Sequence, residues 1–205
     1  MVPFSLRAAS FLFNLICNWQ RAAKNKFVFG RLFLSLGGFM ETCSFFGHRD
    51  TRQTEELKEK IRETVERLIV EKGVDTFLFG SRSKFDELCH IVVTELKEKY
   101  PYIRRIAYLC KHETACLAGA GAETRRTIKL VTGRDVYVGE YEEIKKSDRV
   151  NSAGLVAYVE RNQEMISDSN FVIIYFYKNE KESNGTMLVY KYAKGKRKTL
   201  INVFA

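Results

Sequence analysis

The chain has 205 residues, of which 45% are hydrophobic and 29% are charged, and it contains only two prolines. These values are typical of one soluble globular domain with at most an appendage, and they argue against long disordered linkers. The net charge of +9 would suit a nucleic-acid-binding protein, but residues 1–39 hold five bases and no acid, which leaves 29 bases against 25 acids in residues 40–205. Charge therefore gives little support for DNA binding by the main domain, although a local basic patch stays open.

The cysteines and histidines exclude two further classes of protein. The five cysteines are spread through apolar runs and form no CxxC pair. Isolated thiols in an odd number are typical of reduced core cysteines, so we expect a cytoplasmic protein without a disulfide framework. His48, His90 and His112 lack the spacing of metal ligands, and the sequence predicts no metal site.

Residues 1–39 differ from the rest of the chain. Their apolar islands are interrupted by polar residues and by a basic cluster at 21–26, and none reaches the roughly 20 apolar residues that span a bilayer. A disordered extension and an interfacial amphipathic anchor are two interpretations. The leading one is a wrongly assigned start, because codons for Gly37 and Gly38 can contain a ribosome-binding sequence directly before Met40. We expect one domain over residues 40–205, without membrane association.

From Met40 onward, strand and helix patterns alternate. Residues 43–46 form an apolar run that ends at a glycine, as a buried parallel strand does, and residues 51–73 place apolar side chains at helical spacing. In the unclear region 111–150, a helix is predicted at 122–130 and a short extended piece at 135–141. Elsewhere the patterns predict strands at 75–80, 103–110, 170–177 and 199–204, and helices at 83–100, 153–169 and 186–198.

Strands separated by helices of this length predict a parallel sheet, because the crossover between parallel strands is almost always right-handed. The predicted fold class is α/β, a Rossmann-like three-layer sandwich with a mainly parallel sheet. In such sheets ligands bind beyond the carboxyl ends of the strands, where helix N-termini present unpaired N–H groups. The turns that follow the strands are therefore the candidate site.

The first turn is Gly47-His48-Arg49, followed by Asp50 and Thr51 as the expected cap of the first helix. Glycine permits a tight turn, and His48 and Arg49 at the carboxyl edge of the sheet suit a phosphate or a carboxylate. An equally weighted alternative is that Arg49 pairs with a nearby acid and that His48 caps the turn.

The second turn holds Gly80, Ser81, Arg82 and Ser83, with Asp86 in the first turn of the next helix. Helix capping by the serines and attraction of the acid to the helix dipole explain these residues as well as ligand binding does.

The third turn, Asn184-Gly185-Thr186, opens the penultimate helix. Gly185 leaves room for a ligand at the backbone, and Thr186 offers a hydroxyl and an N–H, although a capped turn is the simpler interpretation of this piece alone. Three such turns at one edge of a sheet favour a shared binding crevice.

Five motifs occur in the same order as in YpsA-like proteins of the SLOG superfamily. They are FFGHR, GSRSKFDEL, YVERNQEMI, SDSNFVIIYF and GTMLVYKYAKGKRKTLINV. The chain resembles this bacterial family over most of residues 40–205, apart from 111–150. The superfamily also includes the DprA proteins and the Lonely Guy phosphoribohydrolases. The resemblance implies a Rossmann-like SLOG domain with a pocket for a nucleotide or an ADP-ribose-like ligand. The expected ligand-binding residues are those that match the family's motifs, together with Arg82 of the second turn. They are Gly47, His48, Arg49, Gly80, Ser81, Arg82, Asp86, Arg161, Asn162, Gly185 and Thr186.

Two departures from the family pattern bear on function. Lys84 and Asn184 stand where YpsA-like members usually have glycine, which would narrow or recharge the pocket. The Lonely Guy enzymes carry a catalytic glutamate in the motif GTxxE, whereas Thr186 is followed by Met-Leu-Val. Without that acid–base carboxylate we expect binding rather than catalysis, and no catalytic residue is assigned.

Three functions stay open. The first is a non-catalytic module that binds or senses a nucleotide-derived small molecule, with His48 and Arg49 on its phosphate. The second is a phosphoribohydrolase-like, nucleotide-processing hydrolase that uses Asp86 or Glu160 in place of the missing glutamate. The third is a DprA-like binder of single-stranded DNA, for which the sequence shows no paired stacking platform. No resident cofactor is predicted, and a homodimer stays open.

Overall fold

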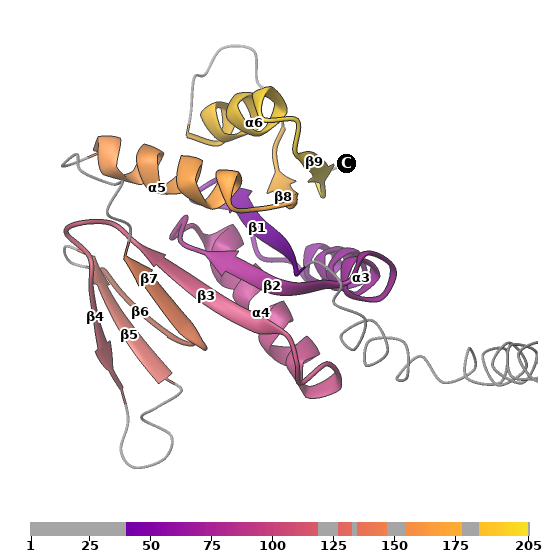
Figure 1. The fold of residues 1–205 in the computed structure, drawn as a ribbon, viewed down its shortest axis with the longest axis horizontal. Coiled ribbons are helices and arrows are strands. Elements are labelled where there is room, and N and C mark those ends of the chain that lie inside the picture. The colour runs from indigo at the N-terminus through magenta and orange to yellow at the C-terminus, as the bar shows by residue number, and fades with distance from the viewer. Residues whose placement is uncertain (1–39, 119–126, 133–134, 147–154, 178–184, 205) are drawn as a thin grey trace, which may run out of the picture.

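A computed structural model describes residues 40–118, 127–132, 135–146, 155–177 and 185–204. The expected extension, residues 1–39, lies outside these ranges. A parallel six-stranded sheet in the order β7-β3-β2-β1-β8-β9 forms the centre of the protein (Figure 1). Its strands are β1 (Glu41–Gly47), β2 (Val74–Phe79), β3 (Arg104–Leu109), β7 (Glu143–Lys146), β8 (Phe171–Tyr175) and β9 (Thr199–Asn202).

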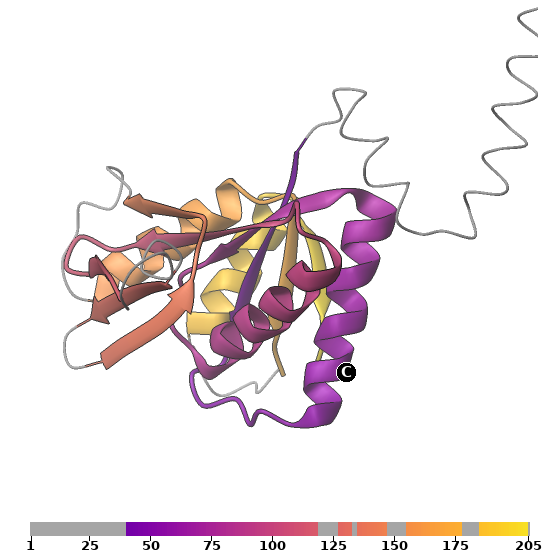
Figure 2. The ribbon, with the colours of Figure 1, turned by 90° about the horizontal axis from the view of Figure 1, so that it is seen from below.

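Two pairs of helices cover the sheet, one pair on each face (Figures 1 and 2). Helices α3 (Glu55–Lys72) and α4 (Lys84–Lys99) pack on one face, and α5 (Leu155–Ser167) and α6 (Gly185–Gly195) pack on the other. The predicted α/β fold, a Rossmann-like three-layer sandwich, is confirmed.

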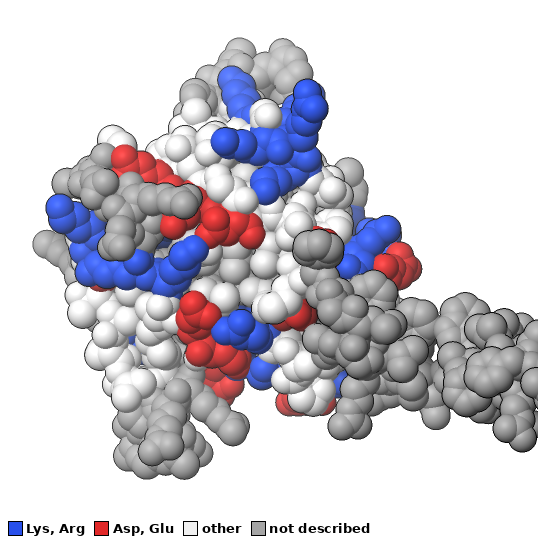
Figure 3. All heavy atoms as spheres, viewed as in Figure 1, with Lys and Arg blue, Asp and Glu red and all other residues white. Residues whose placement is uncertain are grey.

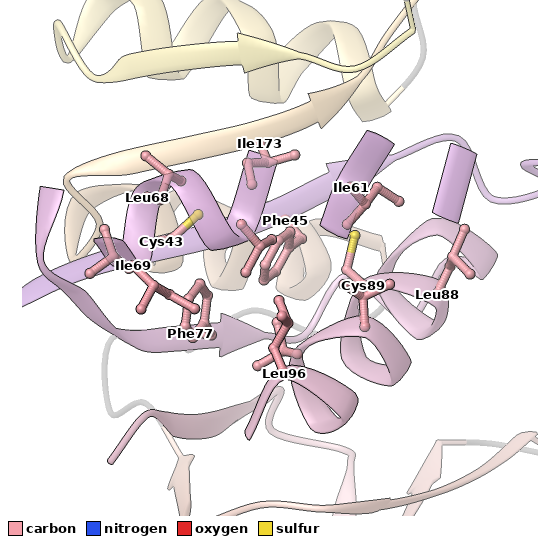
Figure 4. Close-up of a cluster of buried hydrophobic side chains, with 14 of the residues drawn as sticks. Cys43, Phe45, Ile61, Leu68, Ile69, Phe77, Leu88, Cys89, Leu96 and Ile173 are labelled. Atoms are coloured by element: carbon pink, nitrogen blue, oxygen red, sulfur yellow. The ribbon is translucent and has the colours of Figure 1, made fainter. Parts of the chain in front are cut away.

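Strand β1 contributes to both cores, because successive side chains of a strand point to opposite faces. Cys43 and Phe45 pack among the residues of α3 and α4 (Figure 4), whereas Phe46 packs on the α5–α6 side. All three side chains are buried. This double burial explains why the strand is a continuous apolar run rather than an alternating one.

The first helix begins later than the sequence predicts. The N-cap of α3 is Thr54, whose hydroxyl accepts the N–H of Leu57 at 3.2 Å, so the expected cap at Asp50 and Thr51 is wrong. The Thr51 hydroxyl instead donates to the carbonyl of His48 at 2.7 Å and closes the first turn on itself. Residues 48–54 are therefore a loop between β1 and α3.

A second, antiparallel sheet connects β3 to β7. It consists of β4 (Thr114–Leu117), β5 (Thr127–Thr132) and β6 (Asp135–Glu140), in that order. The helix predicted at 122–130 is wrong where the structure describes it, because residues 127–130 belong to β5. Ile128 and Leu130 are buried and Lys129 between them is exposed, which is the two-residue period of a strand. The extended piece predicted at 135–141 corresponds to β6.

The small sheet takes the place of a crossover helix beside β3. Ile128 and Leu130 pack on Ala107 and Leu109 of β3. His90 of α4 contacts the carbonyl of Glu140 through Nε2 at 2.9 Å. These contacts fix β6 against the end of the main sheet. None of the helices within the described ranges is long and apolar enough to cross a membrane.

Gly47, the last residue of β1, supports a first prediction. A Cβ added there would lie 2.5 Å from Cγ of the fully buried Phe85. Because neither group has room to move, we expect Gly47→Ala to lower the free energy of unfolding by about 1–3 kcal/mol in urea denaturation. Gly195→Ala in α6 is the matched control, since a Cβ there meets no atom within 4 Å. Equal stability of the two variants would contradict the tight packing of β1 on α4.

Candidate functional site

The order of strands reverses beside β1. From β1 the chain runs outward through β2, β3 and β7, and it then returns to β8 on the other side of β1. The connections that leave β1 and β8 therefore diverge to opposite faces of the sheet. This is the position at which open α/β sheets leave a crevice beyond the carboxyl ends of the strands.

A cavity of about 730 Å³ lies at this position. Its walls come from the end of β1, the loop after β2, α5 and the first turns of α6. Nine of the eleven expected residues line it, namely Gly47, His48, Arg49, Ser81, Arg82, Arg161, Asn162, Gly185 and Thr186. The three turns predicted to share a crevice do share this one.

The other two expected residues, Gly80 and Asp86, do not line the cavity. Gly80 lies below the loop, where a Cβ would approach the Met165 sulfur to 2.8 Å. Asp86 is 5% exposed, and its carboxylate accepts the backbone N–H of Arg82 at 3.3 Å. Burial raises the pKa of Asp86, although the positive charges of Arg82 and Arg161 oppose the shift. Both residues thus support the loop from beneath.

The N-terminus of α4 joins the first two turns. Its N-cap is Ser83, whose hydroxyl accepts the N–H of Asp86 at 3.1 Å, as the capping alternative predicted. The backbone N–H of Lys84 donates to the carbonyl of Arg49 at 3.0 Å. The helix end nearest the first turn is therefore that of α4 and not that of α3.

Arg49 is exposed at the cavity, and no carboxylate in the described part of the chain lies within 4 Å of its guanidinium. The alternative in which Arg49 pairs with a nearby acid therefore finds no partner among these residues. His48 is partly buried, and its ring centroid lies 4.2 Å from that of Tyr177. In the first turn, Arg49 is thus exposed to solvent, and the His48 ring packs on Tyr177 just after β8.

Two arginines share one buried carboxylate at the cavity wall. Glu113 Oε1 accepts from Arg161 Nη1 at 3.0 Å and from Arg82 Nε at 3.4 Å. Glu113 Oε2 accepts the backbone N–H of Cys110 at 2.8 Å. The side chains of Glu113, Arg161 and Arg82 are 0%, 1% and 6% exposed. Sequence reasoning missed Glu113, whose partners lie 31 and 48 positions away.

The three side chains Glu113, Arg82 and Arg161 carry one more positive than negative charge, and the buried carboxylate of Asp86 also interacts with both arginines. Burial alone would raise the pKa of Glu113, but the charges of Arg82 and Arg161 outweigh it and lower that pKa. Arg161 Nε and Asn162 Oδ1 are buried with no hydrogen-bond partner among the described residues. Arg82 also has a φ of 53°, a left-handed conformation that costs a non-glycine residue about 1–3 kcal/mol. Strain and unpaired polar atoms at one wall are typical of a ligand site.

Two tyrosines that the sequence did not indicate complete the wall. The Tyr137 ring centroid lies 5.9 Å from the Arg82 guanidinium carbon, and its hydroxyl donates to the Arg82 carbonyl at 3.3 Å. The Tyr158 ring centroid lies 5.2 Å from the Arg161 guanidinium carbon. Each arginine is therefore held between Glu113 and an aromatic ring.

Among the described residues, the carboxylates that line the cavity are Asp50 and Glu87, and both are exposed. Glu160, proposed as a substitute acid for a hydrolase, does not line the cavity. No group of three His, Cys, Asp or Glu residues in the described ranges could hold a metal ion.

A separate basic surface lies over α6 and the turn into β9 (Figure 3). The sequence there has no acid between residues 185 and 204, and it contains Lys191, Lys194, Lys196, Arg197 and Lys198. Acidic and basic side chains alternate over the rest of this face (Figure 3). The basic surface lies at the opposite end of α6 from Gly185, which lines the cavity.

Comparison with known proteins shows distant likeness only. No protein-family model and no curated protein matches the chain. The molybdenum cofactor binding protein from the phototrophic bacterium Rippkaea orientalis is 14% identical, with a TM-score of 0.46 over 80% of this chain and 76% of that one. DNA processing protein A from Helicobacter pylori is 15% identical, with a TM-score of 0.42 over 78% of this chain and 63% of that one. At these values of identity and TM-score, neither likeness indicates what this chain binds.

The shared carboxylate supports a second prediction. Glu113→Gln removes the one carboxylate to which both buried guanidiniums donate among the described residues, so we expect the free energy of unfolding to fall by about 3–5 kcal/mol in urea denaturation at pH 7. The matched control is Glu143→Gln, which removes an exposed partner of Arg104 at 2.8 Å and should cost less than about 1 kcal/mol.

The pH dependence of the same variant has a defined sign. The folded-state pKa of Glu113 is below its ordinary value of 4.5, so below that pH the unfolded chain takes up a proton that the folded chain does not. The stability gained from this carboxylate is therefore present above pH 4.5 and lost as the pH falls. The difference in unfolding free energy between wild type and Glu113→Gln should narrow below pH 4.5. A difference that stays constant or widens would contradict the shared ion pair.

Proposed function

We propose that the cavity binds an anionic nucleotide or nucleotide derivative, and that the protein binds or senses this ligand without transforming it. The observation that carries the proposal is that cationic side chains outnumber carboxylates among the described residues that line the cavity, with Arg49, Arg82, Lys84 and Arg161 against Asp50 and Glu87. Arg49, Arg82 and Arg161 line the cavity, and Glu113 is the carboxylate that two of them share. An anion placed among these groups gains attraction that water weakens little at a buried site.

One helix N-terminus strengthens the case for an anion. α6 begins at Gly185, which lines the cavity, whereas Lys84 and Asp86 at the start of α4 already donate their N–H groups to Arg49 and Ser83. The first N–H groups of a helix lack partners within the helix, and they carry partial positive charge. A phosphate between Arg49 and the start of α6 would meet both kinds of donor.

Room for the ligand exists at the third turn. A Cβ added at Gly185 would meet no atom of the described residues within 4 Å, and Gly185 lines the cavity. Thr186, the next residue, is 7% exposed and also lines the cavity. We place the phosphate between the first and third turns, with His48 and Arg49 on one wall and Gly185 and Thr186 on the other.

The positions of the acids favour binding over hydrolysis. Glycosidic hydrolysis of a nucleotide needs a carboxylate within reach of the reacting atoms. Asp86 lies beneath the loop and Glu160 lies outside the cavity wall, so neither candidate acid faces the cavity. Met187, Leu188 and Val189 follow Thr186, where a phosphoribohydrolase would carry its glutamate.

The resemblance to YpsA-like proteins of the SLOG superfamily belongs to the same proposal. The motifs that carry it lie far apart in the sequence, yet His48, Ser81, Arg161 and Thr186 from four of them line one cavity. This convergence supports a shared ligand-binding role for these motifs. We further propose that the protein acts in the cytoplasm, where nucleotides are abundant and thiols stay reduced.

Substitution of Arg49 tests the proposal. A ligand at 100 times its dissociation constant stabilises the folded state by about 2.7 kcal/mol, which raises the melting temperature measurably. In a panel of AMP, GMP, CMP, UMP and ADP-ribose, at least one compound should raise the melting temperature of the wild type. Arg49→Ala should lose most of that rise and keep the ligand-free melting temperature, because the side chain is exposed and makes no ion pair with the described residues.

Arg52→Ala is the matched control. Arg52 is exposed, lies three positions away and does not line the cavity, so its removal changes the net charge by the same amount. This variant should keep the full rise in melting temperature. Equal responses of Arg49→Ala and Arg52→Ala, or no response of the wild type to any compound, would overturn the proposal.

The basic surface over α6 supports a second candidate, the binding of single-stranded nucleic acid. Lys191, Lys194, Lys196 and Arg197 are all exposed there. A single-stranded oligonucleotide in the same panel separates the two functions. Binding that Lys194→Glu abolishes and Arg49→Ala leaves intact would assign the oligonucleotide to α6, apart from the cavity.

A further inference from the structure

An aromatic surface continues from the cavity wall over the ends of β8 and β9. Tyr177 and Phe204 are 43% and 48% exposed, and their ring centroids lie 5.2 Å apart. The ring centroid of His48 lies 4.2 Å from that of Tyr177, and His48 lines the cavity. We call Tyr177 and Phe204 the aromatic platform. It adjoins the cavity through His48.

Side-chain hydrogen bonds of Asn202 hold the backbone of the platform in place. Asn202 Oδ1 accepts the N–H of Phe176 at 3.1 Å and the N–H of Phe204 at 3.2 Å. Asn202 Nδ2 donates to the carbonyl of Phe176 at 2.8 Å. One carboxamide thus fixes the residue before Tyr177 and Phe204 itself.

A second layer of rings supports the platform from below. Tyr175 contacts Phe204 edge-on, with ring centroids 5.3 Å apart, and stacks on Phe85 at 5.7 Å. Phe85 is fully buried and packs against Gly47 of the first turn. The exposed rings are therefore continuous with the core, and a ligand that stacks on them would not have to order them first.

Exposed aromatic side chains that stand alone are common on protein surfaces. Tyr177 and Phe204 differ because they contact each other, because Asn202 fixes their backbone, and because they adjoin a positively charged cavity. The π-face of an aromatic ring attracts other flat rings, and every nucleobase has such a face.

We infer that the aromatic platform stacks the nucleobase of the ligand whose anionic group lies in the cavity. This inference rests on the proposed function, because it requires the phosphate to lie near Arg49 and the start of α6. It also narrows the ligand class to nucleotides with an exposed base, as distinct from sugar phosphates. Since stacking tolerates any base, the platform should distinguish nucleotides from ribose phosphates and not one base from another.

Calorimetric titration with AMP, GMP, UMP and ribose 5-phosphate tests the inference. Base–aromatic stacking contributes enough that the wild type should bind the nucleotides about tenfold more tightly than ribose 5-phosphate. Tyr177→Leu and Phe204→Leu keep an apolar side chain but remove the π-face. Each should reduce this ratio severalfold. Phe204→Leu leaves the contact of Tyr177 with His48 in place, so its dissociation constant for ribose 5-phosphate should stay unchanged, which also shows that this variant is folded.

Tyr102→Leu is the matched control. Tyr102 is 37% exposed and contacts Tyr100 just before β3, at the amino edge of the sheet. This variant should keep the wild-type ratio. Equal affinity of the wild type for AMP and ribose 5-phosphate, or a ratio that survives both platform substitutions, would overturn the stacking inference and leave the anion site standing. No binding of any of the four compounds, together with no response to CMP or ADP-ribose, would overturn the proposed function as well.

Discussion

The reversal of strand order beside β1 is the constraint on which the rest of the structure depends. Parallel strands need long crossovers, and here the crossovers on the two sides of β1 lie on opposite faces of the sheet. The carboxyl end of β1 is left as the floor of a crevice. Close packing of Gly47 on Phe85, with the bond from Lys84 to the Arg49 carbonyl, then brings the first two turns together. The order and direction of the strands thus determine where the site lies in the fold.

Charge decides what the crevice can hold. Glu113 offsets part of the charge of Arg82 and Arg161, and it keeps both guanidiniums folded into the wall. If carboxylates neutralised both arginines, the cluster would attract an anion only weakly. Without Glu113, burial of the two guanidiniums would cost several kcal/mol of stability. Glu113, shared by Arg82 and Arg161, offsets part of their positive charge and leaves part of it. A ligand phosphate would supply the missing negative charge, and the aromatic platform would add a contact for the uncharged part of the same molecule.

The sequence predicted the helices with a regular apolar period and the central strands with continuous apolar runs, and it did not predict β4 or β7. β1, β2, β3, β8 and β9 and the four described helices lie where expected, and nine site residues meet at one cavity. It failed at β5, where Ile128 and Leu130 show only a short two-residue period. Glu113 and the contact of Tyr177 with Phe204 were also missed. Each depends on residues brought together from distant parts of the chain, and no local pattern marks such a pairing.

The measurement that tests the central claim most directly is a map of backbone amide shifts by two-dimensional NMR during titration with AMP. We expect the largest shifts at His48 and Arg49, at Ser81 and Arg82, and at the start of α6, with small shifts along residues 191–198. Saturable shifts confined to residues 191–198 would contradict an anion site at the reversal of the sheet.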